Sequence, residues 1–190
     1  PSSATISTWP LCREKVWNAD PDGQRLNKSM TTKLDASQAS SVNRVITVLS
    51  GGVGAARLLR ALTRFQEEPL TAVVNVGDDL VLHGLTICPD LDTIMYTLAG
   101  LNDELQGWGI SGESWRVRDE LANLGGEAWF SLGDRDLATH LFRSQRLHQG
   151  FTKTAVTSEL VQKFQIPVTL LPATDDEWST RFITEIGELS

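Results

Sequence analysis

The stretch Val45-Ile46-Thr47-Val48-Leu49-Ser50-Gly51-Gly52-Val53-Gly54 decides the fold of this chain. Its first half is a β-branched, aliphatic run, typical of a strand buried in a parallel sheet. The glycines predict a tight turn, and Leu58, Leu62 and Phe65 then share one face of a predicted helix. A second apolar run, residues 70–75, predicts the next strand. This order indicates a doubly wound, mostly parallel α/β sheet of the Rossmann-like type.

The rest of the chain continues as alternating helices and strands. Apolar periodicity and end signals predict helices over residues 89–101, 113–124, 134–147 and 154–164, and strands over 167–171 and 181–186. The last strand runs to the end of the chain with no closing helix, so we expect the sheet to be truncated at its C-terminus and the chain to fold poorly alone.

The first residues differ in character from the others. Residues 1–43 show neither helical nor strand periodicity and are interpreted as a disordered or non-native tail ahead of an α/β domain over residues 44–190. Met30 is either the natural start of the protein or an internal residue of a genuine N-terminus.

Composition excludes several classes of protein. The 190 residues are 41% hydrophobic, enough for a buried core, and no run approaches the length of a membrane span. A net charge of -7 argues against a nucleic-acid surface, although an anionic ligand can bind if a divalent cation stands between the charges. Residues 1–12 do not read as a secretory signal, and Cys12 and Cys88 lack disulfide or metal-ligand spacing, so a cytoplasmic location is expected.

The glycine turn is the first candidate site. Gly51, Gly52 and Gly54 allow a phosphate to approach the backbone closely, and the helix that follows presents free N–H groups at its start. Arg57 lies one turn further along and can add a charge-assisted contact. The alternative is a tight turn that binds nothing, because a glycine cluster alone is a weak signal. The order of strand, turn and helix favours a bound phosphate or nucleotide.

Polar residues also follow the second predicted strand. Asn75, Asp78 and Asp79 lie at its carboxyl end, where ligands bind in sheets of this kind. The two adjacent carboxylates can hold Mg²⁺ or orient a hydroxyl group. The alternative is an Asx-type turn that only caps the loop.

Two more acidic clusters mark the starts of predicted helices. Asp90 is well placed as a helix N-cap, whereas Asp92 falls off the apolar stripe and is a candidate metal or substrate ligand. Further on, Asp134 and Arg135 are favoured as ligand contacts over His140. A helix cap with a surface ion pair explains that last cluster almost as well.

Six motifs together resemble the 2-phospho-L-lactate transferase family, and its actinobacterial type, which uses the phosphoenolpyruvate-derived substrate, most of all. They occur in the family's order: LSGGVGAARLL (49–59), AVVNVGDD (72–79), HGLTICPDLDTIMYTLAGL (83–101), GWGISGESW (107–115), WFSLGDRDLATH (129–140) and LLPATDD (170–176). The match runs from about residue 45 to 189 and corresponds to the N-terminal half of the family.

The resemblance implies an activity. The terminal ribityl hydroxyl of the deazaflavin Fo attacks a guanosine diphosphate ester of lactate or enolpyruvate, GMP leaves, and coenzyme F-420 is assembled with the help of Mg²⁺. It also implies a homodimer when the protein is complete. The choice between lactate and enolpyruvate stays open.

The resemblance assigns roles residue by residue. Asp92 corresponds to the family's acidic position for Fo and metal, Asp78 is the second expected metal ligand, and Asp79 joins them as a catalytic candidate. Ser131 stands where archaeal relatives often carry a basic residue near Fo. Two other functions remain possible: a nucleotide-binding regulator resembling the gluconeogenesis factors, or a catalytically inactive fragment.

Overall fold

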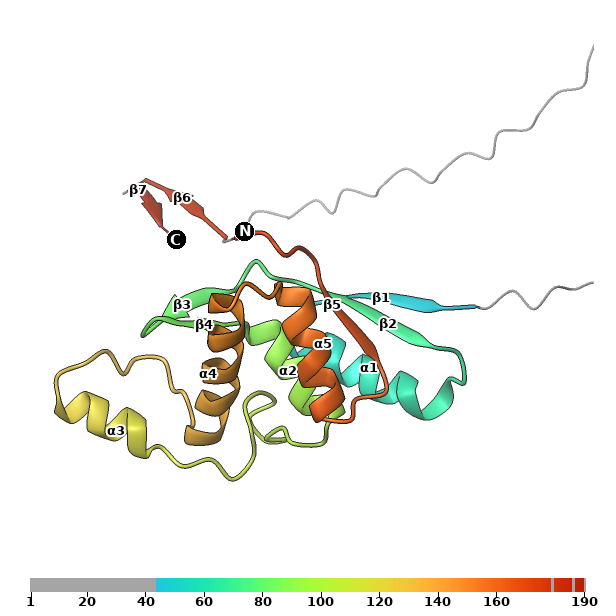
Figure 1. The fold of residues 1–190 in the computed structure, drawn as a ribbon, viewed down its shortest axis with the longest axis horizontal. Coiled ribbons are helices and arrows are strands. Elements are labelled where there is room, and N and C mark those ends of the chain that lie inside the picture. Colours follow the sequence, from blue (N-terminus) through green and yellow to red (C-terminus); the bar gives the residue numbers. More distant parts are fainter. Residues whose placement is uncertain (1–43, 179, 186, 190) are drawn as a thin grey trace, which may run out of the picture. The chain divides into compact units, whose positions relative to one another are not determined.

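The computed structural model describes residues 44–190 apart from residues 179, 186 and 190 (Figure 1). The predicted tail, Met30 and the sheet edge expected at Ile186 therefore lie outside the described residues. The elements are β1 (Ile46–Ser50), α1 (Val53–Phe65), β2 (Leu70–Val74), β3 (Leu80–Leu82), β4 (Leu85–Ile87), α2 (Pro89–Leu98), α3 (Arg116–Asn123), α4 (Asp134–His148), α5 (Lys153–Lys163), β5 (Thr169–Pro172), β6 (Phe182–Thr184) and β7 (Gly187–Leu189).

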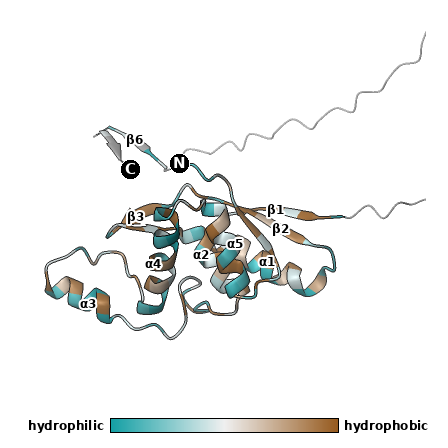
Figure 2. Ribbon diagram, in the orientation of Figure 1, coloured by the Kyte–Doolittle hydropathy of each residue, from teal (hydrophilic) through white to brown (hydrophobic). Residues whose placement is uncertain are grey.

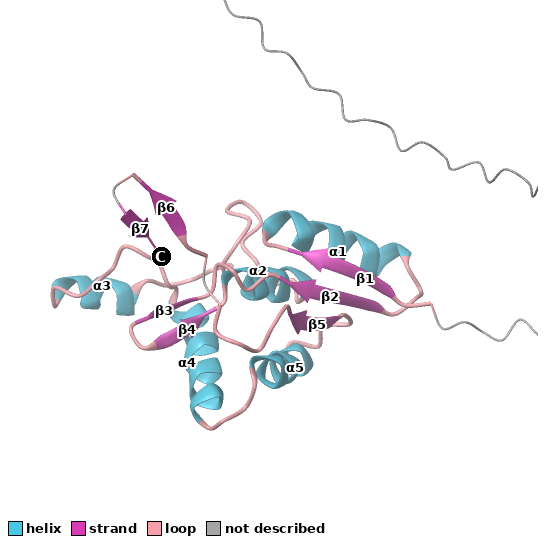
Figure 3. Ribbon diagram, turned by 90° about the horizontal axis from the view of Figure 1, so that it is seen from above, coloured by secondary structure: helices cyan, strands magenta, loops and turns pink. Residues whose placement is uncertain are grey.

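A parallel sheet organises the domain. β1, β2 and β5 lie side by side in that order (Figure 3). Ile46 pairs with Leu70 across the first ladder, and Thr71 pairs with Thr169 across the second. α1 connects the first two strands, as a right-handed βαβ unit requires a helical crossover. The α/β class with a parallel sheet, predicted from the sequence, is confirmed.

One face of this sheet carries the core. Leu70, Ala72 and Val74 alternate along β2 and are buried against helix residues such as Leu59 and Ile94. Hydrophobic residues accordingly colour β1 and β2 in Figure 2. The other face is much less covered among the described residues. On that face β1 leaves Leu49 84% exposed, and β5 leaves Leu171 36% exposed.

The buried side of α1 differs from the predicted one. Ala56 and Leu59 are buried, whereas Leu58 is 51% and Phe65 is 82% exposed. Of the predicted stripe only Leu62 packs against the core. The cause is the small side chain of Ala56, which gives a weak apolar signal although alanine packs well where a helix approaches another element closely. The predicted stripe was therefore rotated by about one residue.

The hairpin of β3 and β4 was missed in the sequence. Its two short strands pair antiparallel, with Leu82 opposite Leu85. The turn residues His83 and Gly84 have φ of 54° and 73°. Positive φ at both central residues matches the twist of a two-residue hairpin, and glycine takes the second position without strain. The predicted last strand, residues 181–186, likewise forms a hairpin, because β6 pairs antiparallel with β7.

Candidate functional site

The glycine turn ends β1 and begins α1. Gly52 is the N-cap of α1, and no side chain caps the free N–H groups of the first turn. Around Gly54 there is open space, since a Cβ atom there would meet nothing within 4 Å. At Gly52, by contrast, a Cβ atom would lie 2.7 Å from Oδ1 of Asp90. The turn therefore presents an exposed backbone with a carboxylate beside it.

Asp90 does not serve as the predicted cap. The N-cap of α2 is the buried Cys88, and no side-chain capping bond is formed. The Asp90 carboxylate instead accepts a hydrogen bond of 2.9 Å from Nδ2 of Asn75. Asn75 follows β2 and Asp90 opens α2, so this bond joins the predicted loop site to the glycine turn. Burial raises the pKa of the Cys88 thiol to about 12.

Asp92 is more buried than Asp90, and its carboxylate forms an ion pair with an arginine. Its side chain is 7% exposed, and Oδ2 accepts a 3.1 Å hydrogen bond from Nη1 of Arg143, while Oδ1 accepts one from Nη2. Arg143 comes from α4 and is fully buried. Burial alone would lower the pKa of Arg143, but the charge of Asp92 raises it. The result is a two-bond ion pair fixed in both position and charge.

A second carboxylate, that of Asp136, lies beside this pair, with a ligand atom within 4.8 Å of those of Asp92 and His140. Tyr96 Oη donates a 2.6 Å hydrogen bond to its Oδ1, and His140 Nε2 is 3.2 Å from the same atom. Burial disfavours the charged form of Asp136, but the contacts with His140 and Tyr96 and the charge of Arg143 together hold its pKa below the usual value. Burial raises the pKa of Tyr96, which therefore stays a hydrogen-bond donor.

Two adjoining cavities open onto these groups. A cavity of about 250 Å³ joins the glycine turn to the buried polar cluster, and its lining includes Gly52, Asp90, Asp92, Asp136 and His140. A second one of about 320 Å³ is lined by Trp108, Trp115, Glu113, Ser131 and Asp136, among others. Trp108 and Asp136 border both. The glycine turn and three carboxylates therefore face one space.

Asp79 is committed to an ion pair. Its carboxylate accepts a 2.6 Å hydrogen bond from Nζ of Lys153, the first residue of α5, and both side chains are nearly buried. Burial raises the pKa of Asp79, and the lysine offsets part of that rise. Asp78 is exposed, and neither aspartate is among the residues that line the two cavities. Asp79 therefore holds the loop after β2 against α5.

Asp134 and Arg135 make contacts within the fold. The Asp134 carboxylate accepts hydrogen bonds from the backbone N–H groups of Arg116 and Val117 at the start of α3, and Ser114 Oγ donates another. These bonds lower the pKa of Asp134. Arg135 donates a 2.6 Å hydrogen bond to the Ser111 carbonyl. Their predicted ligand role stays a prediction, while both visibly stabilise the segment before α4.

Ser131 has a basic neighbour after all. Nη1 of Arg118, on α3, lies 3.5 Å from its hydroxyl oxygen, and the guanidinium stacks 5.0 Å from the ring centre of Trp115. Arg57 projects from α1 to the loop at Gly107, where a Cβ atom would lie 3.6 Å from its Nη2. Each cavity thus has an arginine close to its rim.

Sequence reasoning missed Arg143 and Tyr96 as parts of the site. Tyr96 lies among the apolar residues of α2, and only the tertiary packing of α4 against β4 and the nearby start of α2 shows the partners of both residues. One signal was available for α4, because Asp136, His140 and Arg143 recur at helical spacing and so share one face.

The parallel sheet and the glycine turn at its carboxyl edge define the class: an α/β protein of the Rossmann-like kind. Residues 46–190 match the model of the family described as 2-phospho-L-lactate transferase CofD. The chain belongs to this family.

Curated relatives carry the name phosphoenolpyruvate transferase. The one from Nocardia farcinica is 50% identical over 140 residues, which cover 73% of this chain and 42% of that protein. The one from Mycolicibacterium smegmatis is 50% identical over 149 residues, which cover 73% of this chain and 46% of that protein. A crystal structure of a UPF0052-family protein from Bacillus halodurans matches with a TM-score of 0.48 and 18% identity, over 77% of this chain and 45% of that one. The chain spans less than half the length of the curated relatives it matches.

No helix in the described part of the chain is both long enough and apolar enough to cross a membrane.

Proposed function

We propose that the protein transfers a phosphoenolpyruvyl or phospholactyl group from a guanosine diphosphate ester to the deazaflavin Fo, with release of GMP, in the assembly of coenzyme F-420. Membership of the family supports this, and the name shared by the relatives favours enolpyruvate over lactate. The observation that carries the proposal is the single cavity shared by the glycine turn and three carboxylates. Fo, the guanosine ester and a homodimeric assembly belong to the same proposal.

The chemistry is a displacement at phosphorus. The terminal ribityl oxygen of Fo forms a bond to the phosphorus that carries the ester, the phosphoanhydride bond to GMP breaks, and the hydroxyl proton is released to solvent. Such a transfer depends on positioning and charge neutralisation and needs no covalent enzyme intermediate. Among the described residues that line the cavity, glycines and carboxylates supply these two functions.

The two substrates fit different parts of the site. The donor phosphates would lie on Gly52 and Gly54 at the start of α1, with Arg57 adding charge from the rim. The hydroxyl of Fo would donate to Asp92, whose carboxylate Arg143 holds still. The flat ring of Fo suits the larger cavity, where Trp108 and Ser131 are part of the lining.

Mg²⁺ fits the acidic edge of the glycine turn. A phosphate on this turn would face the Asp90 carboxylate, and the two would repel unless a divalent cation stood between them. In proteins Mg²⁺ is usually held by one or two carboxylates together with substrate phosphates. Asp90 and Asp92, which both line the cavity at the glycine turn, would hold the ion, and the ion would neutralise charge on the diphosphate.

The experiment is a transfer assay on the protein made from its complete gene. GMP release is measured with Fo and with either the enolpyruvyl or the lactyl donor at several Mg²⁺ concentrations. We expect release that requires both Fo and Mg²⁺, and a rate lower by roughly two to three orders of magnitude for Asp92→Asn. Asp119→Asn, an exposed change on α3, is the control.

Two outcomes carry different meanings. A folded protein that releases no GMP from either donor would disprove the proposed activity. If Asp92→Asn instead kept the rate and Mg²⁺ dependence of the unchanged protein, transfer would stand but Asp92 would be removed from the site.

A further inference from the structure

His140 is the unusual member of the buried cluster. Its side chain is 1% exposed, it lines the 250 Å³ cavity, and its Nε2 atom has no hydrogen-bond partner among the described residues. Oδ1 of Asp136 lies 3.2 Å from Nε2, close enough for the two groups to interact electrostatically, but the N–H bond is not directed at this oxygen and makes no hydrogen bond to it. Leaving such a group unpaired in the interior is unfavourable, so an unpaired nitrogen facing a cavity points to a ligand.

Arg143 determines which nitrogen of His140 carries the proton. Its Nη1 atom lies 3.2 Å from Nδ1 of His140. A guanidinium nitrogen can only donate, so Nδ1 must accept and cannot carry hydrogen. The neutral ring then has its hydrogen on Nε2. His140 therefore offers an N–H donor to the cavity.

This tautomer argues against a metal at the same place. Asp92, Asp136 and His140 bring ligand atoms within 4.8 Å of one another, which is the spacing of a possible metal site. A metal at Nε2 would need a lone pair there, and the hydrogen would move to Nδ1, against the Arg143 donor. Mg²⁺, moreover, prefers oxygen ligands.

A donor and an acceptor that line the same cavity, His140 and Asp92, are the complement of an alcohol hydroxyl. A hydroxyl group donates one hydrogen bond and accepts others, so it can give its proton to Asp92 while accepting from His140 Nε2. The carboxylate keeps lone pairs free, because Arg143 uses only part of its accepting capacity.

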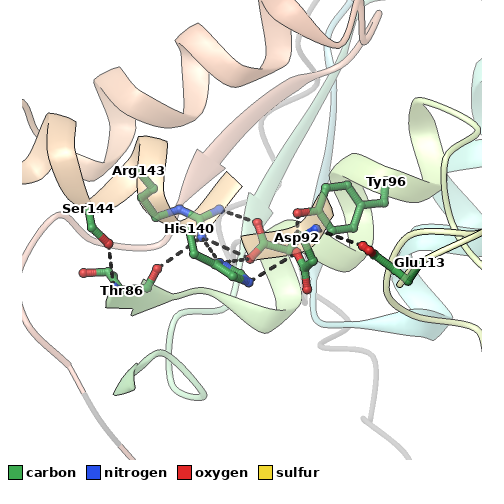
Figure 4. Close-up of polar contacts among 8 residues, drawn as sticks. Thr86, Asp92, Tyr96, Glu113, His140, Arg143 and Ser144 are labelled. Atoms are coloured by element: carbon green, nitrogen blue, oxygen red, sulfur yellow. Dashed lines mark hydrogen bonds and ion pairs between the residues drawn. The ribbon is translucent and has the colours of Figure 1, made fainter. Parts of the chain in front are cut away.

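We propose that His140 contacts a hydroxyl of the polyol chain of the acceptor, and that Arg143 is a positioning residue which fixes both the Asp92 carboxylate and the tautomer of His140. Figure 4 shows the arrangement, with the guanidinium reaching both side chains. The inference rests on the proposed function for the identity of the polyol. It assigns to α4 a specificity role that the sequence motifs did not predict.

The first test reads the tautomer directly and needs no activity. Long-range ¹H–¹⁵N spectra of ¹⁵N-histidine-labelled protein distinguish the two ring nitrogens, and single substitutions assign the signals of the three histidines. We expect His140 to show hydrogen on Nε2 alone, and Arg143→Lys, which keeps the charge but not the planar fork, to change that pattern. Hydrogen on Nδ1 in the unchanged protein would overturn the inference.

The second test separates hydroxyl recognition from folding. Binding of Fo, and of an analogue with methyl in place of the ribityl chain, is followed by fluorescence. His140→Leu removes the donor, His140→Gln keeps an N–H₂ group at a similar reach, and His148→Leu changes an exposed position at the end of the same helix. We expect His140→Leu to weaken Fo binding roughly three- to tenfold, the glutamine variant to recover part of it, and binding of the analogue to be unchanged.

An equal loss for both ligands would show a merely structural role, and no loss for Fo would show that the contact does not exist. If the unchanged protein bound neither ligand, the proposed function would fail and the polyol contact with it, whereas the tautomer would still be decided by the spectra.

Discussion

At the scale of single residues, Gly52 and Gly54 belong to one motif but differ in the space around them. Gly52 leaves room for the Asp90 carboxylate, so a side chain there would displace Asp90 whether or not a ligand binds. Gly54 faces open space within the first turn of α1. It is therefore the position where a ligand effect can be measured without disturbing the protein.

Gly54→Ala should weaken nucleotide binding while the fold becomes no less stable. Alanine favours a helix over glycine by up to about 1 kcal/mol, but its methyl group occupies the space a phosphate needs. We expect GMP affinity by calorimetry to fall at least about tenfold and the melting temperature to stay level or rise. Ala122→Gly in α3 is the control, and it should lower stability without changing affinity. Unchanged affinity in Gly54→Ala would remove the turn from the site.

Asp136 provides a pH-dependent contribution to stability. Its folded pKa lies below the ordinary value of 3.8 because of Tyr96 on α2 and His140 and Arg143 on α4. A depressed folded pKa adds stability that is complete above the unfolded pKa and disappears as pH falls through the folded one. Asp136→Asn should therefore cost roughly 1–3 kcal/mol near neutral pH, and the difference should shrink below about pH 4.

Denaturant unfolding of the two proteins between pH 2.5 and 7.5 measures this difference. Asp119→Asn, an exposed change on α3, should differ hardly at all from the unchanged protein in its free energy of unfolding over this pH range. A difference that grew towards acid pH would contradict the assigned direction of the shift.

At the scale of elements, the site is assembled where loops and helix starts converge. The loop after β2 meets the start of α5 through Asp79 and Lys153, and it meets the start of α2 through Asn75 and Asp90. The first contact joins residues 74 apart in the chain, so the position of the loop depends on α5 as well as on α2.

Lys153→Met should destabilise the protein by roughly 3–5 kcal/mol, because it leaves the Asp79 carboxylate nearly buried without its partner. Adding Asp79→Asn to this variant should restore much of the loss, since no buried charge then remains. Lys163→Met, exposed at the other end of α5, is the matched control. Chemical unfolding of the unchanged protein, of Lys153→Met and Asp79→Asn singly, and of the double variant gives the coupling free energy, and additive losses would mean that the pair is not coupled.

The elements follow local patterns in the sequence, whereas the site does not. β1, the glycine turn and α1 were predictable because strand, glycine and helix signals occur within twenty residues. The buried face of α1 and the hairpin at His83 depended on packing and turn chemistry that periodicity does not report. Asp92 was identified because it is polar among apolar neighbours. Arg143 could not be identified, because its partner is 51 residues away and only folding brings them together.

At the scale of the whole described domain, the less covered face of the sheet affects behaviour in solution. Leu49 and Leu171 flank Val73 in register on this face, one from each neighbouring strand. Exposed contiguous apolar surface of this kind favours association. The loop residue Leu105 is more exposed than either but lies away from the sheet, so it has no such neighbours.

We therefore expect the chain to aggregate or to melt over a broad range. Leu49→Thr should reduce light scattering during heating at little cost in stability, because its side chain contacts little and threonine suits a strand. Leu105→Ser should have no such effect. A sharp, reversible transition with monomeric elution of the unchanged chain would show that the described domain is self-sufficient.

The thiol of Cys88 is fully buried at the start of α2, two residues before Asp90, and its pKa is raised to about 12. Alkylating reagents attack the thiolate, so they reach this sulfur only in molecules whose α2 has come away from the core. The rate of labelling therefore reports how often those openings occur, and we expect a nucleotide bound to the glycine turn, as proposed, to lower that rate. Alkylation of Cys88 thus measures how often the start of α2, next to the proposed binding site, opens.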